Sequence, residues 1–83
     1  MMNISIEYCS VWGYLPQATS LAAELREKFN VESELIASSH GVFEVVVDGT
    51  NIFSKKELGR LPDHSEIIES INSTNWFNAF AKF

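Results

Sequence analysis

Apolar and polar side chains alternate at the start of the chain. The residues that point one way are Ile4, Ile6 and Tyr8, and those that point the other way are Asn3, Ser5 and Glu7. Alternation with a period of two is typical of a strand that buries one of its faces. The pattern therefore predicts a strand from Asn3 to Tyr8.

The spacing of apolar residues changes to a helical period from Leu15 onward. The stripe of apolar positions consists of Leu15, Ala18, Leu21, Ala22, Leu25 and Phe29. Polar residues lie mostly outside this stripe, as in an amphipathic helix that packs on a core. Pro16 fits the first turn, because its missing N–H would have no partner there anyway. We expect a helix from about Pro16 to Phe29.

Three short segments in the middle of the chain have the character of strands. They are Glu34–Ala37, Val42–Val47 and Thr50–Ser54. The second is rich in β-branched residues, which favour strands. Between the last two lies Asp48-Gly49, a pair typical of a two-residue hairpin turn. The last two strands are therefore predicted to pair in antiparallel fashion.

The C-terminal third is predicted to be helical, in two parts. Asp63 can cap a helix that begins near Pro62, and Glu66 three residues later completes a capping box. The run Asn72–Asn75 should weaken or end this helix, because its side chains compete for backbone hydrogen bonds. A separate short helix or a bent continuation is expected after it. Four aromatic residues there are assigned to the core or to an interface: Trp76, Phe77, Phe80 and Phe83.

The predicted order of elements is β-α-β-β-β-α. A strand–helix–strand unit implies a right-handed parallel crossover, and the hairpin adds antiparallel strands. We expect an α/β fold, an open sandwich in which a small mixed sheet carries helices on one face or both. The 83 residues fit one domain, 1–83, with an aromatic C-terminal extension at about 74–83.

Composition and charge narrow the classes of function. The net charge of -5 argues against nucleic acid or an anionic membrane as the main partner. One cysteine and two separated histidines have no metal-ligand spacing, so no metal is expected. A lone cysteine forms no internal disulfide, which favours a reducing cytoplasm. The first residues have no basic segment followed by a long apolar run, so no signal peptide is expected.

Cys9 is the main candidate for chemistry. It follows the first strand directly and precedes the first helix, and ligands gather at the carboxyl ends of parallel strands. A helix N-terminus stabilises a thiolate, which is the nucleophile in thiol–disulfide exchange. This position predicts a reactive and at least partly exposed thiol. The alternative is that Cys9 is a small buried hydrophobe without a chemical role.

Several short motifs follow one another in a fixed order. They are Tyr8-Cys9-x-x-Trp12-Gly13-Tyr14-Leu15-Pro16-Gln17-Ala18, Gly41-Val42-Phe43-Glu44-Val45, Asp48-Gly49, Ser54-Lys55-Lys56 and Leu61-Pro62-Asp63. As an ordered set they resemble the selenoprotein W-related family, the SelW, SelT and SelH group, from about Ile4 to Ile71. The resemblance implies a thioredoxin-like fold and a Cys-x-x-Cys or Cys-x-x-selenocysteine motif in the first loop. It also implies glutathione or protein thiols as substrates, without a resident cofactor.

The chain departs from that family at Trp12, where the second cysteine or the selenocysteine of the motif should be. An indole cannot resolve a mixed disulfide. Either Trp12 is native, and the protein is a monothiol variant or a binding module, or it stands for a selenocysteine encoded by UGA. So large a side chain at a tight corner should point outward. If Trp12 evolved for the core instead, it should be mostly buried. Exposed aromatic residues could then pair two copies as a dimer.

Two hypotheses for function follow. In the first, the protein is a thiol oxidoreductase in which Cys9 reacts with glutathione, protein disulfides or peroxides, and the redox-motif loop comprises Ser10, Val11 and Trp12. His40 could stabilise a thiolate, and Lys55 with its neighbour Lys56 could guide an anionic substrate such as glutathione. In the second, the protein is a non-catalytic interaction module whose thioredoxin-like groove binds a partner through exposed aromatic residues.

Overall fold

The computed structural model describes the backbone of residues 3–81 and the side chains of residues 3–72. Four strands and three helices follow one another in the order β1, α1, β2, β3, β4, α2, α3. Their bounds are β1 Ile4–Cys9, α1 Leu15–Phe29, β2 Ser33–Ser38, β3 Phe43–Val47, β4 Thr50–Ser54, α2 Lys55–Leu58 and α3 His64–Ala81. The predicted order is confirmed, with one addition, the short helix α2.

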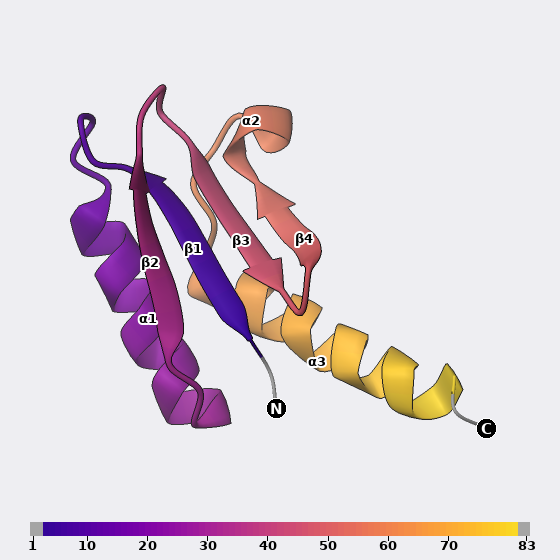
Figure 1. The fold of residues 1–83 in the computed structure, drawn as a ribbon. Helices are drawn as coiled ribbons and strands as arrows, with labels where there is room; N and C mark the ends of the chain where they lie inside the picture. Colours follow the sequence, from indigo (N-terminus) through magenta and orange to yellow (C-terminus); the bar gives the residue numbers. More distant parts are fainter. Residues whose placement is uncertain (1–2, 82–83) are drawn as a thin grey trace.

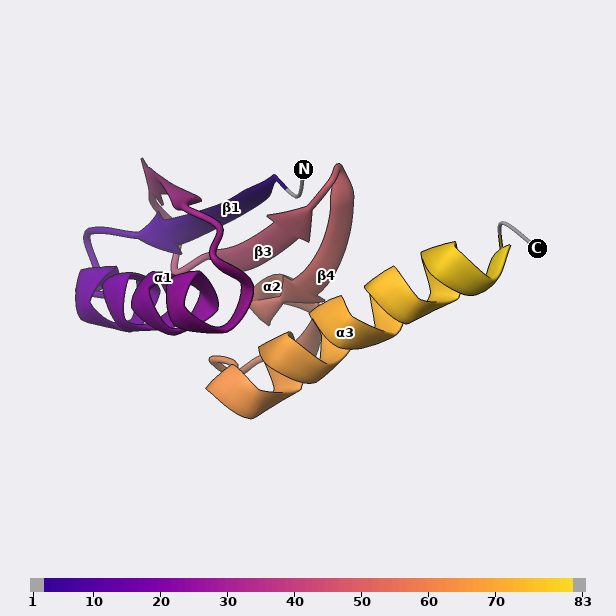
Figure 2. The same ribbon diagram turned by 90° about the horizontal axis from the view of Figure 1, so that it is seen from below.

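The strands form one mixed sheet in the order β2-β1-β3-β4. β1 and β2 are parallel, and α1 connects them, which confirms the predicted crossover. β3 lies antiparallel to both β1 and β4. α1 and α3 lie on the same side of the sheet (Figures 1 and 2). Of the two predicted arrangements, helices on one face or on both faces, the structure therefore has the first. The fold is the expected open α/β sandwich.

The hairpin between β3 and β4 turns at Asp48 and Gly49, as the sequence predicts. Both residues have positive φ angles, 51° and 82°, which a two-residue turn of the right twist requires. The Asp48 carboxylate also accepts a hydrogen bond of 2.8 Å from the backbone N–H of Asn3. This bond fixes the turn to the start of β1.

The core lies between the sheet and the two long helices. Alternation along β1 and β3 supplies its sheet side, and the apolar stripe of α1 supplies much of its helix side. Its buried members are Ile4, Ile6, Tyr8, Ala18, Leu21, Leu25, Phe43, Val45, Val47, Phe53, Ile67 and Ile71. The stripe prediction is wrong for Leu15, which is the first residue of α1 and is exposed.

The C-terminal helix decides between the two predicted alternatives. α3 runs without interruption from His64 to Ala81, so the separate short helix is wrong and the helix continues. Local competition for backbone hydrogen bonds is weak, and the helix continues through it. The predicted placement of the four aromatic side chains, from Trp76 to Phe83, lies outside the described side chains.

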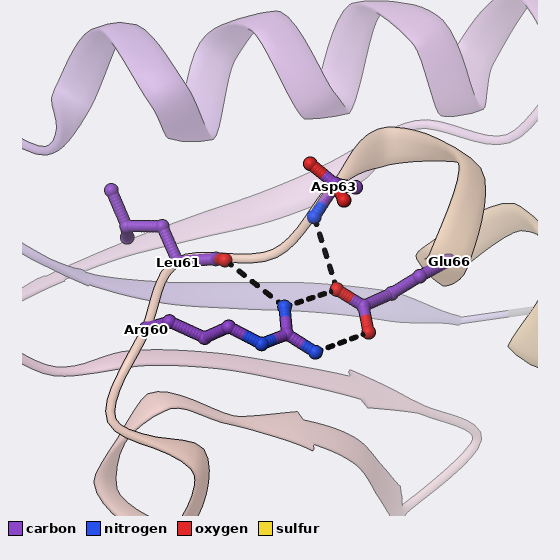
Figure 3. Close-up of polar contacts among 4 residues, drawn as sticks. All are labelled: Arg60, Leu61, Asp63 and Glu66. Carbon is purple, nitrogen blue, oxygen red and sulfur yellow. Dashed lines mark hydrogen bonds and ion pairs between the residues drawn. The ribbon is translucent and has the colours of Figure 1, made fainter.

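The first turn of α3 is held by a network of charged groups (Figure 3). Glu66 accepts a hydrogen bond of 3.1 Å from the backbone N–H of Asp63, which is the predicted half of the capping box. Arg60 donates to both carboxylate oxygens of Glu66, at 2.6 and 2.8 Å. The pKa of Glu66 is lowered to about 2. The main cause is its hydrogen bonding to Arg60, and the second is the hydrogen bond from the Asp63 N–H.

This network predicts a pH dependence. The Glu66 carboxylate contributes stability that is present above its ordinary pKa of 4.5 and is lost as the pH falls towards 2. In an Arg60→Gln variant we expect the pKa of Glu66 to rise towards 4.5, as followed by NMR titration of its carboxyl carbon. Arg26→Gln, which breaks the exposed pair with Glu32, is the control and should leave Glu66 unchanged. An unchanged Glu66 pKa in Arg60→Gln would contradict the assignment.

A second polar contact joins the two long helices. Nδ1 of His64 lies 2.6 Å from Oε1 of Glu24, and both side chains are about one third exposed. This contact ties the start of α3 to the middle of α1.

Candidate functional site

Cys9 is the last residue of β1, at the carboxyl end of the parallel pair with β2. It is fully buried, so the prediction of a partly exposed thiol is wrong. The cause is that two loops meet above it. One is the turn 10–14, which leads to α1, and the other is the loop 39–42, which joins β2 to β3.

Hydrogen bonds fix both loops around Cys9. Its backbone N–H donates to the carbonyl of Val42, at 2.9 Å, and its carbonyl accepts from Tyr14, at 3.1 Å. Ser10 is exposed, and its backbone N–H and hydroxyl both donate to the carbonyl of Ser38. Cys9 is therefore a buried residue that is also held by backbone contacts to both loops.

The thiol has a polar partner of its own. The backbone N–H of Trp12 donates a hydrogen bond to Sγ of Cys9, at 3.3 Å. A thiolate accepts such a bond more strongly than a thiol does, since it carries a full charge. The turn thus presents a donor to the one sulfur atom that could act as a nucleophile.

The Trp12 side chain points outward, as predicted, and is 60% exposed. Val11 beside it is 78% exposed. The indole extends across to the loop 39–42: a Cβ atom built on Gly41 would lie 2.5 Å from Cζ3 of Trp12. Only glycine leaves room for the ring at this position, and the φ of +67° at Gly41 also favours glycine.

Lys55, the first residue of α2, completes an aromatic and cationic cluster. Its Nζ lies 5.3 Å from the ring centroid of Trp12 and 5.7 Å from that of Tyr14. Tyr14 contacts Trp12 and Phe43 edge-on, with centroids 6.1 and 6.4 Å apart. The cluster thus connects the exposed indole to a residue of the core.

A shallow hollow lies beside this cluster. It is lined by His40, Gly41, Val42, Lys55, Lys56 and Gly59. The structure therefore brings together His40 and Lys55, which the sequence named separately as weak candidates for substrate binding. His40 is exposed, has a φ of 63°, and its Nδ1 lies 2.9 Å from Oγ of Ser39. Among the described residues its ring has a hydrogen-bond contact with Ser39 and none with Cys9, so its predicted effect on a thiolate stays a prediction.

Sequence reasoning missed the stacking of Lys55 on the two aromatic rings. The short helix α2 makes it, because the N-cap Ser54 accepts a hydrogen bond from the backbone N–H of Glu57 and turns the chain back over the first loop. The pattern Ser54-Lys55-Lys56-Glu57 contains that signal, a serine with an acidic residue three positions later.

Among the described residues, no group of His, Cys, Asp and Glu side chains could hold a metal ion. Within the same part of the chain, no helix has the length and apolar character needed to cross a membrane.

Comparison with known proteins now adds to this geometry. The family model of the Rdx family matches residues 3–73, which is most of the chain. The chain belongs to the Rdx family. Because selenoprotein W-related proteins are among its structural neighbours, the predicted resemblance is confirmed, and the Rdx chain is a thioredoxin-like protein of a redox-type family.

Two curated relatives and two solved structures are similar to this Rdx chain. Migration and invasion enhancer 1 of Bos taurus is 32% identical over 71 residues, and that of Mus musculus is 31% identical over 71 residues. These matches cover 84% of this chain but only 62% of each relative, so the chain spans about three fifths of their length.

Of the solved structures, a protein from Bordetella parapertussis superposes with a TM-score of 0.83 at 24% identity, over 88% of this chain and 96% of that one. A selenoprotein W-related protein from Vibrio cholerae gives a TM-score of 0.77 at 25% identity, over 88% of this chain and 95% of that one. The first likeness shows the fold alone. Together they confirm the predicted α/β architecture.

Proposed function

We propose that this Rdx protein carries out thiol–disulfide exchange through Cys9 as a single thiol. The observation that carries the proposal is the hydrogen bond from the Trp12 N–H to Sγ of Cys9, at the carboxyl end of β1 in a redox-type family. A buried cysteine that only fills space would need no donor aimed at its sulfur.

The proposed exchange has two steps. The Cys9 thiolate attacks a disulfide R–S–S–R′, forms the mixed disulfide Cys9–S–S–R and releases R′–S⁻. An external thiol then attacks the sulfur of R, takes R away as a new disulfide, and returns Cys9 as a thiolate. The external thiol supplies the reducing electrons, because position 12 is an indole and offers no resolving group.

The hollow beside the site supports a substrate class. Two neighbouring cations, Lys55 and Lys56, line it, which favours a disulfide with carboxylate groups. Glutathione and protein disulfides that carry acidic residues fit this description. The second step needs an abundant external thiol, so the proposal places the protein in a reducing compartment, the cytoplasm.

A second candidate function is a non-catalytic interaction module. The observation that favours it is the exposure of Val11 and Trp12, two apolar side chains at the tip of the turn. Exposed aromatic residues contribute strongly to protein interfaces, and a second copy of the chain is one partner of this kind. The module would bind without any need for the thiol, which separates it from the first candidate.

A test of the main proposal uses oxidised glutathione as the probe. We expect the protein to gain one glutathionyl group, detected by intact mass spectrometry and removed again by reduced glutathione. Cys9 is the one cysteine of the sequence, so Cys9→Ser should gain none. If the folded parent protein gains no adduct under conditions that modify a free cysteine peptide, the exchange proposal fails and the interaction module is favoured.

A further inference from the structure

We propose that the Trp12 indole is a gate over the Cys9 thiol, seated on Gly41 and held closed by Lys55. A gate here means a side chain that must move before a reagent reaches the sulfur. The inference deepens the proposed function, because it concerns access to the same thiol. Its test does not use a disulfide, so the two can fail separately.

The position of the indole supports this role. The turn 10–14 and the loop 39–42 are the two segments that border Cys9, as the bonds of Cys9 to Tyr14 and to Val42 show. The indole begins on the turn and ends on the loop, where its ring lies against Gly41. It therefore bridges the two segments that border the thiol.

The difference in exposure between Cys9 and Trp12 also supports a gate. Cys9 is 0% exposed, whereas Trp12 is 60% exposed. A side chain that is mostly in water can rotate on a timescale of picoseconds to nanoseconds, far faster than a loop rearranges. Moving the indole is therefore a low-cost route to the thiol, and unfolding of the turn is a high-cost route.

Lys55 links the gate to substrate charge. Its ammonium lies 5.3 Å from the indole centroid, within the range of a cation–π contact. It also lines the basic hollow together with Lys56. A carboxylate that enters the hollow competes with the indole for the same ammonium. An anionic disulfide would then loosen the gate as it arrives, whereas a neutral reagent of the same size would not.

The experiment measures alkylation of Cys9 by iodoacetamide, a small neutral probe, in the folded protein. We expect Trp12→Ala to raise the rate about fivefold, because it removes the bridge and its contact with Lys55 without touching the backbone N–H that bonds Sγ. Trp12→Phe keeps an aromatic ring and should stay close to the parent. Lys55→Met should raise the rate about two- to fivefold, the worth of an exposed cation–π contact.

Val11→Ala is the matched control, since Val11 is an exposed apolar neighbour in the same turn and is not among the atoms nearest to Gly41. Its rate should equal that of the parent. Gly41→Ala should speed alkylation as well, because the added Cβ displaces the ring. If that variant does not fold, Trp12→Ala decides alone.

Two results would overturn the gate. One is an alkylation rate in Trp12→Ala equal to that of the parent. The other is a gain in rate no larger than the rise in the unfolded fraction measured by urea denaturation of the same variant, which would mean that reagents reach Cys9 only by global unfolding. A gated thiol that forms no glutathione adduct would refute the exchange proposal and leave the gate intact.

Discussion

Replacing Trp12 with cysteine should raise the rate of glutathione-coupled disulfide reduction by at least about tenfold, because a second thiol in the turn can resolve the mixed disulfide. The backbone nitrogen of Trp12 lies 3.3 Å from Sγ of Cys9, so a side chain at this position starts close to the sulfur. In the parent protein the Cys9 adduct must wait for a second external thiol, and turnover should be slow.

The control for this experiment is Trp12→Ser. It removes the indole in the same way as Trp12→Cys does, and it supplies no thiol. The difference between the two variants therefore measures resolution alone, apart from any effect of opening the site. Equal rates in Trp12→Cys and Trp12→Ser would mean that a resolving thiol at this position does not function, and our reading of the motif would be wrong.

Phe43→Ala should lower the free energy of unfolding by about 3–5 kcal/mol, the range for removing a large buried aromatic side chain. Phe43 is 1% exposed, and its ring packs edge-on against Tyr14 at the base of the aromatic cluster. The loss would leave a cavity between β3 and the first loop. Urea denaturation of both proteins measures the difference.

Trp12→Ser is the matched comparison, because Trp12 lies at the exposed end of the same aromatic cluster. Trp12 is mostly exposed, so its removal should change the free energy of unfolding by less than about 1 kcal/mol. This result is also expected if Trp12 stands for a selenocysteine. A loss of several kcal/mol would contradict both that account and the exposed position of the ring.

The element pattern could be predicted from the sequence because it depends on local periodicity. Ile4, Ile6 and Tyr8 define a strand with one buried face, and Asp48-Gly49 define a hairpin, whatever the rest of the chain does. The capping of α3 by Glu66 is equally local. Parallel pairing of β1 and β2 followed from the crossover rule rather than from any one residue.

Predictions failed where a local signal competed with the neighbouring structure. The polar run Asn72–Asn75 does not end α3, because a few tenths of a kcal/mol of propensity per residue are too little to break a helix already formed. Leu15 lies on the apolar stripe of α1 but at its exposed end. In both cases the type of element was predicted correctly and its extent was not.

The sequence by itself determined that Cys9 lies between a strand and a helix, in a motif without its second thiol. Only the tertiary structure decided how accessible that thiol is. Its burial depends on the turn 10–14 meeting the loop 39–42, and the seating of Trp12 on Gly41 depends on segments about 30 residues apart. Contacts between distant segments carry no periodic signal in one sequence, since they arise from how the strands are ordered in the sheet.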